Sequence, residues 1–179
     1  MPYFLGIDPG LSAMGLAVVE TYSMELQKCY LIKTIKDALK KNDSVATDNL
    51  RRCRQVRQEL VALDQQYAFA GIAMESFSAP RHASSAAKYA MSVGIIWGLF
   101  GDRPVLQATP QEIKIRLGGK RSASKNEVRS GLEGEYSNLS EALTDITKGQ
   151  QHHAVDGLAA LVTCMDSDQL RMTQLIGGA

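Results

Sequence analysis

Two carboxylates each close an apolar run of the sequence, at the point where a buried strand would reach the surface. Asp8 ends the run at residues 3–8, just before a Pro-Gly turn, and Glu75 ends a second run at residues 69–75. Such an acid could ligate a metal or face a phosphate, or it could merely accept hydrogen bonds from its own turn. For Asp8 alone these interpretations are balanced, and possible partners elsewhere in the chain favour the first.

A third acid lies near the start of the last strongly periodic segment, residues 152–165. Asp156 is three residues after His153 and four after His152, so either imidazole can share its face of a helix. Carboxylates with one imidazole favour Mg²⁺ or Mn²⁺ over Zn²⁺. If the acids converge, they could hold two cations roughly 3.5–4 Å apart for the hydrolysis of a phosphodiester. Spacing alone does not establish this convergence.

Hydrophobic periodicity predicts the elements that would position these side chains. Strands are expected at residues 3–8, 14–21, 28–36, 69–75 and 104–107, and helices at 48–67, 82–100, 110–118, 124–131 and 152–165. Two capping boxes, Thr109 with Glu112 and Ser124 with Glu127, start the third and fourth helices. Residues 134–149 are expected to be a loop with partial helix, and no firm structure is expected beyond Asp166. This order predicts an α/β protein.

The helix predicted at residues 82–100 is rich in Ala, Ser and Gly. Small side chains let backbones approach closely, so this helix should pack tightly against a neighbour. Packing in the core of the same chain is the default interpretation, and a dimer contact is the sharper alternative.

Composition limits the class of protein. A chain of 179 residues with 45% hydrophobic residues is long enough for one well-buried domain. Its net charge of +1 does not indicate a polyanionic partner. The charges are unevenly distributed, since residues 28–57 hold nine basic and three acidic residues, and residues 103–129 hold seven and two. Residues 130–168 reverse the balance, with one lysine against seven acids. This pattern suggests a polarised surface with one face for a polyanion, although a solvated face is the commoner explanation.

The cysteines and the apolar runs indicate the compartment. Three widely spaced cysteines without a C-x-x-C pair, Cys29, Cys53 and Cys164, are expected to be free thiols in a reducing environment. No signal peptide is recognisable, and no apolar run reaches the ~18 residues of a membrane span. A cytoplasmic protein without membrane contact is expected.

Five segments, taken in order, resemble motifs of the RuvC-type Holliday junction resolvases over roughly residues 3–165. They are Gly-Ile-Asp-Pro-Gly at 6–10, Met-Glu at 74–75 followed by the Ala/Ser-rich helix, Ala-Thr-Pro-Gln-Glu-Ile-Lys at 108–114, Ser-Ala-Ser-Lys at 122–125, and His-Ala-Val-Asp-Gly-Leu-Ala at 153–159. The resemblance implies a ribonuclease H-like mixed five-stranded sheet flanked by helices, with one nuclease domain over residues 1–166 and a tail at 167–179. It also implies a homodimer that cuts two strands of a four-way or branched DNA, and branch-migration machinery as a further candidate partner.

The same resemblance assigns roles to individual residues. It gives metal binding and catalysis to Asp8, Glu75, His153 and Asp156, with two Mg²⁺ per site and Mn²⁺ as a substitute. Asp8 would bridge the metals, and His153 would ligate a metal or act on the attacking water, with His152 as its competitor.

The DNA contacts implied by the resemblance lie on either side of these acids. Lys114 and Lys125 would contact phosphates of the scissile strand, although exposed lysines at helix ends are the plainer interpretation. The remaining candidates are Phe77, Arg81, His82, Lys120 and Arg121, and Phe77 stands one place before the family's junction-inserting aromatic residue.

Three alternatives stay open from the sequence. A branched-DNA or flap nuclease of relaxed specificity would use the same site. A non-catalytic junction-binding protein would be expected to lose at least one carboxylate, whereas every motif position here holds a competent ligand. A nucleotide-binding domain of the actin and sugar-kinase type would need a second phosphate hairpin and roughly twice the length.

Overall fold

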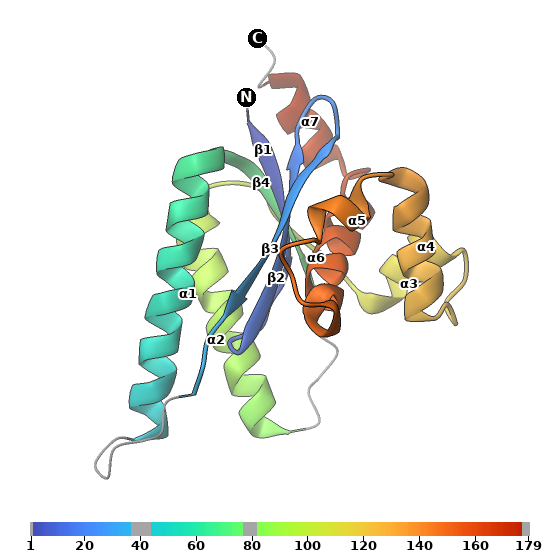
Figure 1. Cartoon of the computed structure of the whole chain (residues 1–179). Helices are drawn as coiled ribbons and strands as arrows, with labels where there is room; N and C mark the ends of the chain where they lie inside the picture. The colour runs from blue at the N-terminus through green and yellow to red at the C-terminus, as the bar shows by residue number, and fades with distance from the viewer. Residues whose placement is uncertain (1, 37–43, 77–81, 177–179) are drawn as a thin grey trace.

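The computed structural model describes residues 2–36, 44–76 and 82–176, and Figure 1 shows a twisted sheet between two layers of helices. The strands are β1 (Tyr3–Asp8), β2 (Ala13–Glu20), β3 (Leu26–Lys33), β4 (Phe69–Glu75) and β5 (Val105–Ala108). The helices are α1 (Val45–Tyr67), α2 (Ala83–Phe100), α3 (Pro110–Gly118), α4 (Lys125–Glu135), α5 (Leu139–Ala142), α6 (Gln151–Cys164) and α7 (Asp168–Ile176), with a 3₁₀ turn η1 (Lys148–Gln150). The predicted α/β class is confirmed.

The sheet has the order β3-β2-β1-β4-β5 and is mixed. Strands β1, β2 and β3 form an antiparallel meander, whereas β4 pairs in parallel with both β1 and β5. Ile7 pairs with Met74, and the next residue on each strand is an acid. Because parallel strands end at the same edge of a sheet, Asp8 and Glu75 come side by side there.

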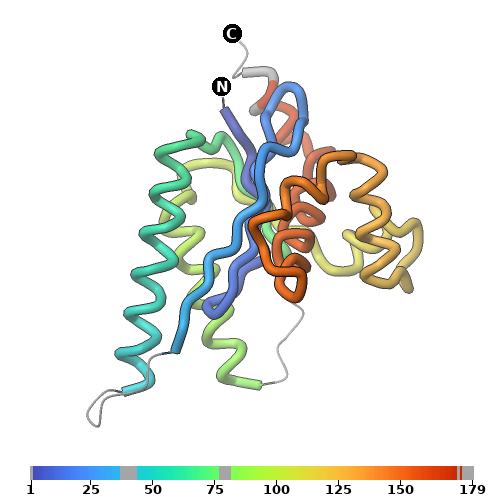
Figure 2. Tube along the Cα trace, viewed as in Figure 1, coloured from blue at the N-terminus to red at the C-terminus, as the bar shows by residue number. Residues whose placement is uncertain are grey.

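Each face of the sheet has its own core. Helices α1 and α2 cover one face, over buried side chains that include Leu5 and Ile72. Helix α6 covers the other face, and most of its length is buried because α3, α4 and α5 lie outside it. Figure 2 shows how residues 139–164 lie against the first strands of the chain, far from them in sequence.

Both predicted capping boxes are present, and they fix where α3 and α4 begin. The side chains of Thr109 and Ser124 accept from the backbone N–H groups of Glu112 and Glu127, whose carboxylates accept from the cap residues in return. Helix α3 ends as predicted, because Gly119 adopts a left-handed φ of 71°.

Four expectations about the elements were wrong. The third strand spans Leu26–Lys33 rather than residues 28–36. The first helix begins at Val45 rather than 48, capped by Ser44, and α4 continues past 131 to Glu135. Residues 168–176, where no firm structure was expected, form α7, whose Leu170 is buried. A helix of nine residues is too short to give a strong periodic signal, which explains why α7 was missed.

The predicted loop at residues 134–149 does contain partial helix, and it is more buried than its sequence suggests. Leu139, Leu143 and Ile146 belong to the core beneath it. They come from α5 and the turns that follow, so no single period links them. All three cysteines are free thiols, as expected. Within the described ranges, no helix is long and apolar enough to cross a membrane.

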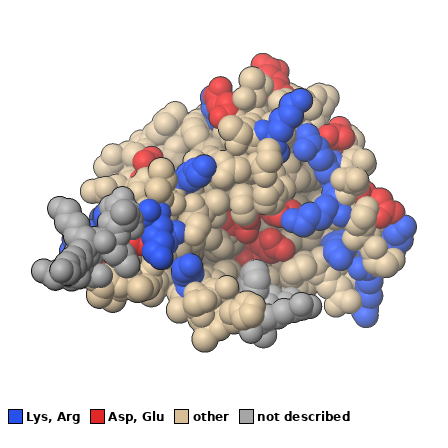
Figure 3. Space-filling model, turned by 60° about the horizontal axis from the view of Figure 1, so that its bottom comes forward, with Lys and Arg blue, Asp and Glu red and all other residues tan. Residues whose placement is uncertain are grey.

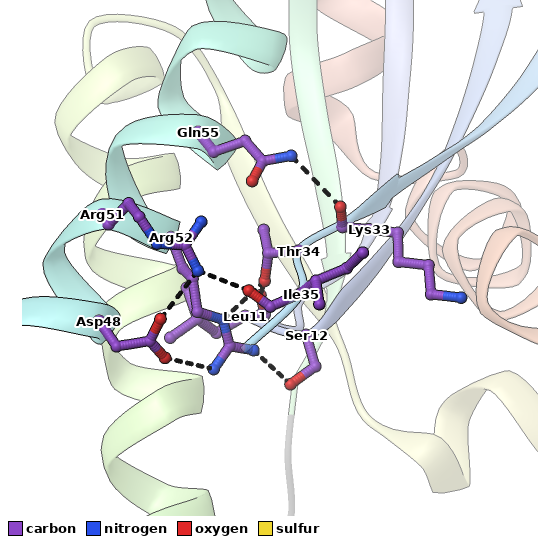
Figure 4. Close-up of polar contacts among 9 residues, drawn as sticks. All are labelled: Leu11, Ser12, Lys33, Thr34, Ile35, Asp48, Arg51, Arg52 and Gln55. Atoms are coloured by element: carbon purple, nitrogen blue, oxygen red, sulfur yellow. Dashed lines mark hydrogen bonds and ion pairs between the residues drawn. The ribbon is translucent and has the colours of Figure 1, made fainter. Parts of the chain in front are cut away.

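A buried polar network joins the start of α1 to the turn after β1 (Figure 4). Arg52 is 3% exposed, and its guanidinium donates to the hydroxyls of Thr34 at 2.8 Å and Ser12 at 2.6 Å. Asp48, 5% exposed, lies 3.8 Å from the same guanidinium. The Thr34 hydroxyl donates in turn to the carbonyl of Leu11. Buried polar groups of this kind hold the hairpin that begins at Asp8 only while all of them are paired.

Arg52→Met should lower the free energy of unfolding by about 2 kcal/mol, because it removes the donor from the buried Thr34 hydroxyl and the anchor of Ser12, while Asp48 keeps its 2.8 Å contact with Arg51. Urea unfolding followed by circular dichroism measures the change. The matched control is Arg54→Met on the exposed side of the same helix, which should stay within about 0.5 kcal/mol of wild type. Equal effects of the two variants would contradict a stabilising role for the network.

Candidate active site

The four predicted catalytic side chains come together in one pocket at the end of β1 and β4. The pocket has a volume of about 450 Å³. Its lining residues are Asp8, Pro9, Glu75, Pro110, Ile113, Lys114, Lys125, Val128, His152, His153 and Asp156. Figure 3 turns this end of the molecule forward, and acidic side chains gather near the middle of the face with lysines and arginines on both sides.

Helix α6 reaches the strand-end acids because glycines remove the side chains that would hold it away. A Cβ at Gly15 would lie 2.0 Å from the carbonyl carbon of His153, and one at Gly6 would lie 2.3 Å from the carbonyl oxygen of Gly157. A Cβ at Gly157 would lie 3.1 Å from the backbone nitrogen of Asp8. The first turns of α6 therefore pack directly on the backbone of β1 and β2. This contact brings His153 and Asp156 to Asp8.

His153 is bound to Asp8. Its Nδ1 lies 2.7 Å from Asp8 Oδ2, and both side chains are mostly buried, at 27% and 20% exposed. The hydrogen bond to the Asp8 carboxylate raises the pKa of His153, and the negative charges of Asp8 and Asp156 add to this against the opposing effect of burial. A protonated Nδ1 donates to the carboxylate and fixes its orientation.

Asp156 has a different partner. The ammonium of Lys125, the first residue of α4, lies 2.8 Å from Asp156 Oδ2. Lys114 on α3 lines the same pocket. The capping boxes at the starts of α3 and α4 thus place two lysines beside three acids.

The surroundings of Glu75 disfavour the ionised form of its carboxyl. Burial and, to a smaller extent, the neighbouring carboxylates Asp156 and Asp8 together raise the pKa of its carboxyl to about 7, against the opposing charge of Lys125. The three acids thus share one region of negative potential, which a bound cation would neutralise.

A family model described as Crossover junction endodeoxyribonuclease RuvC matches residues 4–164. The chain belongs to the RuvC family. Proteins named crossover junction endodeoxyribonuclease RuvC from Thermotoga petrophila and Thermotoga maritima are 23% and 22% identical to it over 141 residues. These matches cover 76% of this chain and 79% and 78% of the relatives.

Solved structures show the same fold. Thermus thermophilus RuvC in complex with a Holliday junction substrate is 21% identical, with a TM-score of 0.70 over 91% of this chain and 92% of that one. The yeast mitochondrial Holliday junction resolvase Ydc2 is 13% identical, with a TM-score of 0.66 over 98% and 81%. The predicted ribonuclease H-like fold is confirmed. By its family the chain is a crossover junction endodeoxyribonuclease, which decides against the nucleotide-binding alternative.

Three further DNA-contact candidates of this RuvC family member, Lys120, Arg121 and His82, lie outside the pocket lining. Lys120 is paired with Glu127 at 2.6 Å, and Arg121 and His82 are exposed, His82 at the start of α2. Phe77 and Arg81 fall outside the described residues. His152 lines the pocket with its ring centroid 4.1 Å from that of His153, but the contact with Asp8 belongs to His153.

Two groups of site residues were missed from the sequence. Apolar side chains of Pro110, Ile113 and Val128 wall the pocket on the side of α3 and α4. Gly6 and Gly15 admit helix α6, and a glycine inside a strand is a recognised sign of close backbone approach. The two glycines precede and follow Asp8 in the sequence, so they could have indicated this close approach.

The donor set suits a hard divalent cation, since it offers three carboxylates and one imidazole. Among the residues described here, no three His, Cys, Asp or Glu side chains already form a cluster that could hold a metal ion. Asp8 and Asp156 instead contact His153 and Lys125. The residue types fit the cation, and small side-chain movements would have to complete its coordination.

The raised pKa of Glu75 predicts how the metal-free protein responds to pH. The carboxyl has an ordinary pKa of 4.5, and its value of about 7 in the fold means that ionisation between these values costs folded-state stability. Glu75→Gln should therefore exceed wild type in unfolding free energy by about 2 kcal/mol at pH 8, with little difference at pH 4.5. Urea unfolding in EDTA at both pH values measures this. A difference that did not change with pH would mean that Glu75 titrates normally.

Proposed function

We propose that this RuvC family member resolves four-way DNA junctions by paired symmetrical cuts, using Mg²⁺ or Mn²⁺ bound by Asp8, Glu75 and Asp156. The observation that supports this most is the meeting of three acids and His153, from three separate segments of the chain, in one open pocket. Every predicted ligand position is filled, which argues against the non-catalytic alternative.

The pocket residues have separable tasks in this mechanism. Bound divalent cations would supply an activated water and stabilise the leaving oxygen of the phosphodiester. Asp8, Glu75 and Asp156 would hold them, and His153 would keep the Asp8 carboxylate oriented through its 2.7 Å hydrogen bond. Lys114 and Lys125 on the pocket wall would draw in and position the backbone phosphate, so the acids are not left to repel it.

Two symmetrical cuts need two sites related by a twofold axis, and an exposed face of α2 suits such a homodimer. The opposite face of α2 is buried in the core through Val93, Ile96 and Phe100. The exposed face carries Trp97, 52% exposed, and Met91, 36% exposed. A Cβ at Gly94 or Gly98 would meet nothing within 4 Å, so these glycines leave room for a second helix to approach. The helix thus supports both sequence interpretations, the core contact on one side and a dimer contact on the other.

Gly98→Arg should convert the dimer into monomers and abolish paired cutting, because a charged side chain would stand in the approach of the two helices. Sedimentation velocity measures the mass, and junction cleavage measures the pairing of cuts. The matched control is Gly134→Arg on α4, where a Cβ also meets open space, and it should stay dimeric. A dimeric Gly98→Arg protein would move the dimer contact elsewhere.

The function is tested by cleavage of a labelled four-way junction beside a flap, a fork and a linear duplex, each with Mg²⁺ and with EDTA. Paired symmetrical cuts confined to the junction and lost in EDTA are expected. Equal cutting of flap and fork would assign a branch nuclease of relaxed specificity to the same site. Binding without cutting would leave a junction-binding protein.

The proposed function also suggests a partner and a cellular location. Branch-migration machinery would be the natural partner, because it acts on the same junction. The three free thiols agree with the expected cytoplasmic location.

A further inference from the structure

Lys125 places a positive charge among the acids of the pocket. Its ammonium lies 2.8 Å from Asp156 Oδ2 and donates a hydrogen bond to it. Burial lowers the pKa of Lys125, but the hydrogen bond to Asp156 and the charges of Asp156, Glu75 and Asp8 together raise it. The Lys125 ammonium therefore interacts electrostatically with all three carboxylates, and its hydrogen bond is to Asp156.

The other basic side chains near the pocket are placed differently. Lys120 is held by Glu127, an acid outside the pocket lining. Lys114 lines the pocket, and among the described contacts it has no ion pair with a pocket acid. Lys125 therefore differs from Lys114 and Lys120 by its ion pair with a pocket acid, and not by its charge.

The two members of this ion pair differ in how firmly they are held. The Asp156 side chain is 21% exposed on the buried helix α6, whereas that of Lys125 is 73% exposed. The capping box fixes the backbone at the start of α4 and leaves the long lysine side chain free to turn. Since exposed ion pairs contribute little, Lys125 can leave Asp156 at small cost.

A divalent cation held by Asp156 would compete with the Lys125 ammonium, which already occupies Oδ2 of this carboxylate. Both neutralise the repulsion among the three acids, and Asp156 cannot present the same lone pairs to both. The displaced ammonium would still lie at the pocket rim, where a DNA phosphate is expected.

We propose that Lys125 is a tethered counter-ion of the metal-free site, which occupies Asp156 until a divalent cation displaces it and then becomes available to a DNA phosphate. This inference rests on the proposed metal-dependent function. Its consequence is a thermodynamic coupling, because each ligand helps to release Lys125 for the other, so metal and DNA bind more tightly together than separately.

The first test is calorimetric titration of Mn²⁺ into the DNA-free protein. Lys125→Met should bind Mn²⁺ about fivefold more tightly than wild type, since the competing ammonium is gone. Lys114→Met is the matched control, because it removes the same charge from the same pocket without removing a contact to Asp156. Its affinity should stay within about twofold of wild type.

The outcomes separate the inference from the function on which it rests. If Mn²⁺ binds wild type and Lys125→Met equally, or if Lys114→Met tightens binding as much, the counter-ion role is wrong while a metal-dependent nuclease stands. If neither wild type nor Lys125→Met binds Mn²⁺, the proposed metal site fails and the inference with it.

A second test needs no folded variant. In wild-type protein labelled with ¹⁵N-lysine, the ammonium signal of Lys125 should be slow to exchange with water while Asp156 holds it. Saturation with Mg²⁺ should broaden this signal by freeing the ammonium, whereas the signal of Lys120, paired with Glu127, should not change. A Lys125 signal that persists unchanged with Mg²⁺ bound would overturn the proposal.

Discussion

Asp8→Asn is expected to lower junction cleavage by about a thousandfold or more, equivalent to about 4 kcal/mol of transition-state stabilisation, while junction binding is kept or strengthened. Asparagine has almost the same size as aspartate, so the pairing of β1 with β2 and β4 should survive. What disappears is the negative charge and one anionic oxygen at the centre of the proposed metal site. The hydrogen bond from His153 loses its charged acceptor as well.

Binding should not fall with cleavage, because it depends on other groups. The phosphate backbone is attracted by Lys114, Lys125 and the basic side chains around the acids, and one acid fewer reduces the repulsion. Single-turnover cleavage measures the rate, and fluorescence anisotropy of the labelled junction measures affinity. Asp145→Asn is a suitable control, because this exposed acid pairs with Lys28 outside the pocket lining. A variant that retained turnover would remove Asp8 from the mechanism.

The strand-end acids could be predicted from sequence because the rule behind them is local. An acid that closes an apolar run must emerge at the edge of the sheet, and β1 and β4 are parallel, so Asp8 and Glu75 emerge at the same edge. The capping boxes at Thr109 and Ser124 were equally local and were equally well predicted.

The choice between His152 and His153 could not be made from the local sequence. Both line the pocket, and only the rotation of α6 against the sheet gives His153 the contact with Asp8. The motif register selected His153, whereas helix periodicity accepted either residue. Likewise, spacing could place Lys125 at a helix start, but its contact with Asp156 spans 31 residues and depends on how α4 packs beside α6.

Helix α7 and the burial of residues 139–146, which the sequence did not predict, share a physical cause. Residues 139–146 and α7 bury isolated side chains, such as Leu143 and Leu170, against a core built elsewhere in the chain. Their burial is decided by what lies beneath them and leaves no repeat in their own sequence. Burial of this kind becomes predictable only once the sheet and α6 are in place.

Gly15→Ala is expected to lower cleavage by about a hundredfold and to lower the free energy of unfolding by about 3 kcal/mol, although it adds a single methyl group. The added carbon would lie 2.0 Å from the carbonyl carbon of His153 and 2.4 Å from the backbone nitrogen of Ala154. Both atoms are backbone, so no side chain can turn aside. Either β2 bends or the start of α6 moves outward, and both shifts separate His153 from Asp8.

Graded substitutions distinguish this displacement from a general effect of alanine. Gly157→Ala meets its nearest atoms only at 3.1 Å, so a shift of a few tenths of an ångström suffices and a smaller loss of cleavage is expected. Gly134→Ala on α4 meets nothing within 4 Å and should be neutral or slightly stabilising. Cleavage and urea unfolding of the three variants should therefore rank in the order of their contact distances. If Gly15→Ala cut like Gly134→Ala, the close approach of α6 to β2 would not be what brings His153 to Asp8.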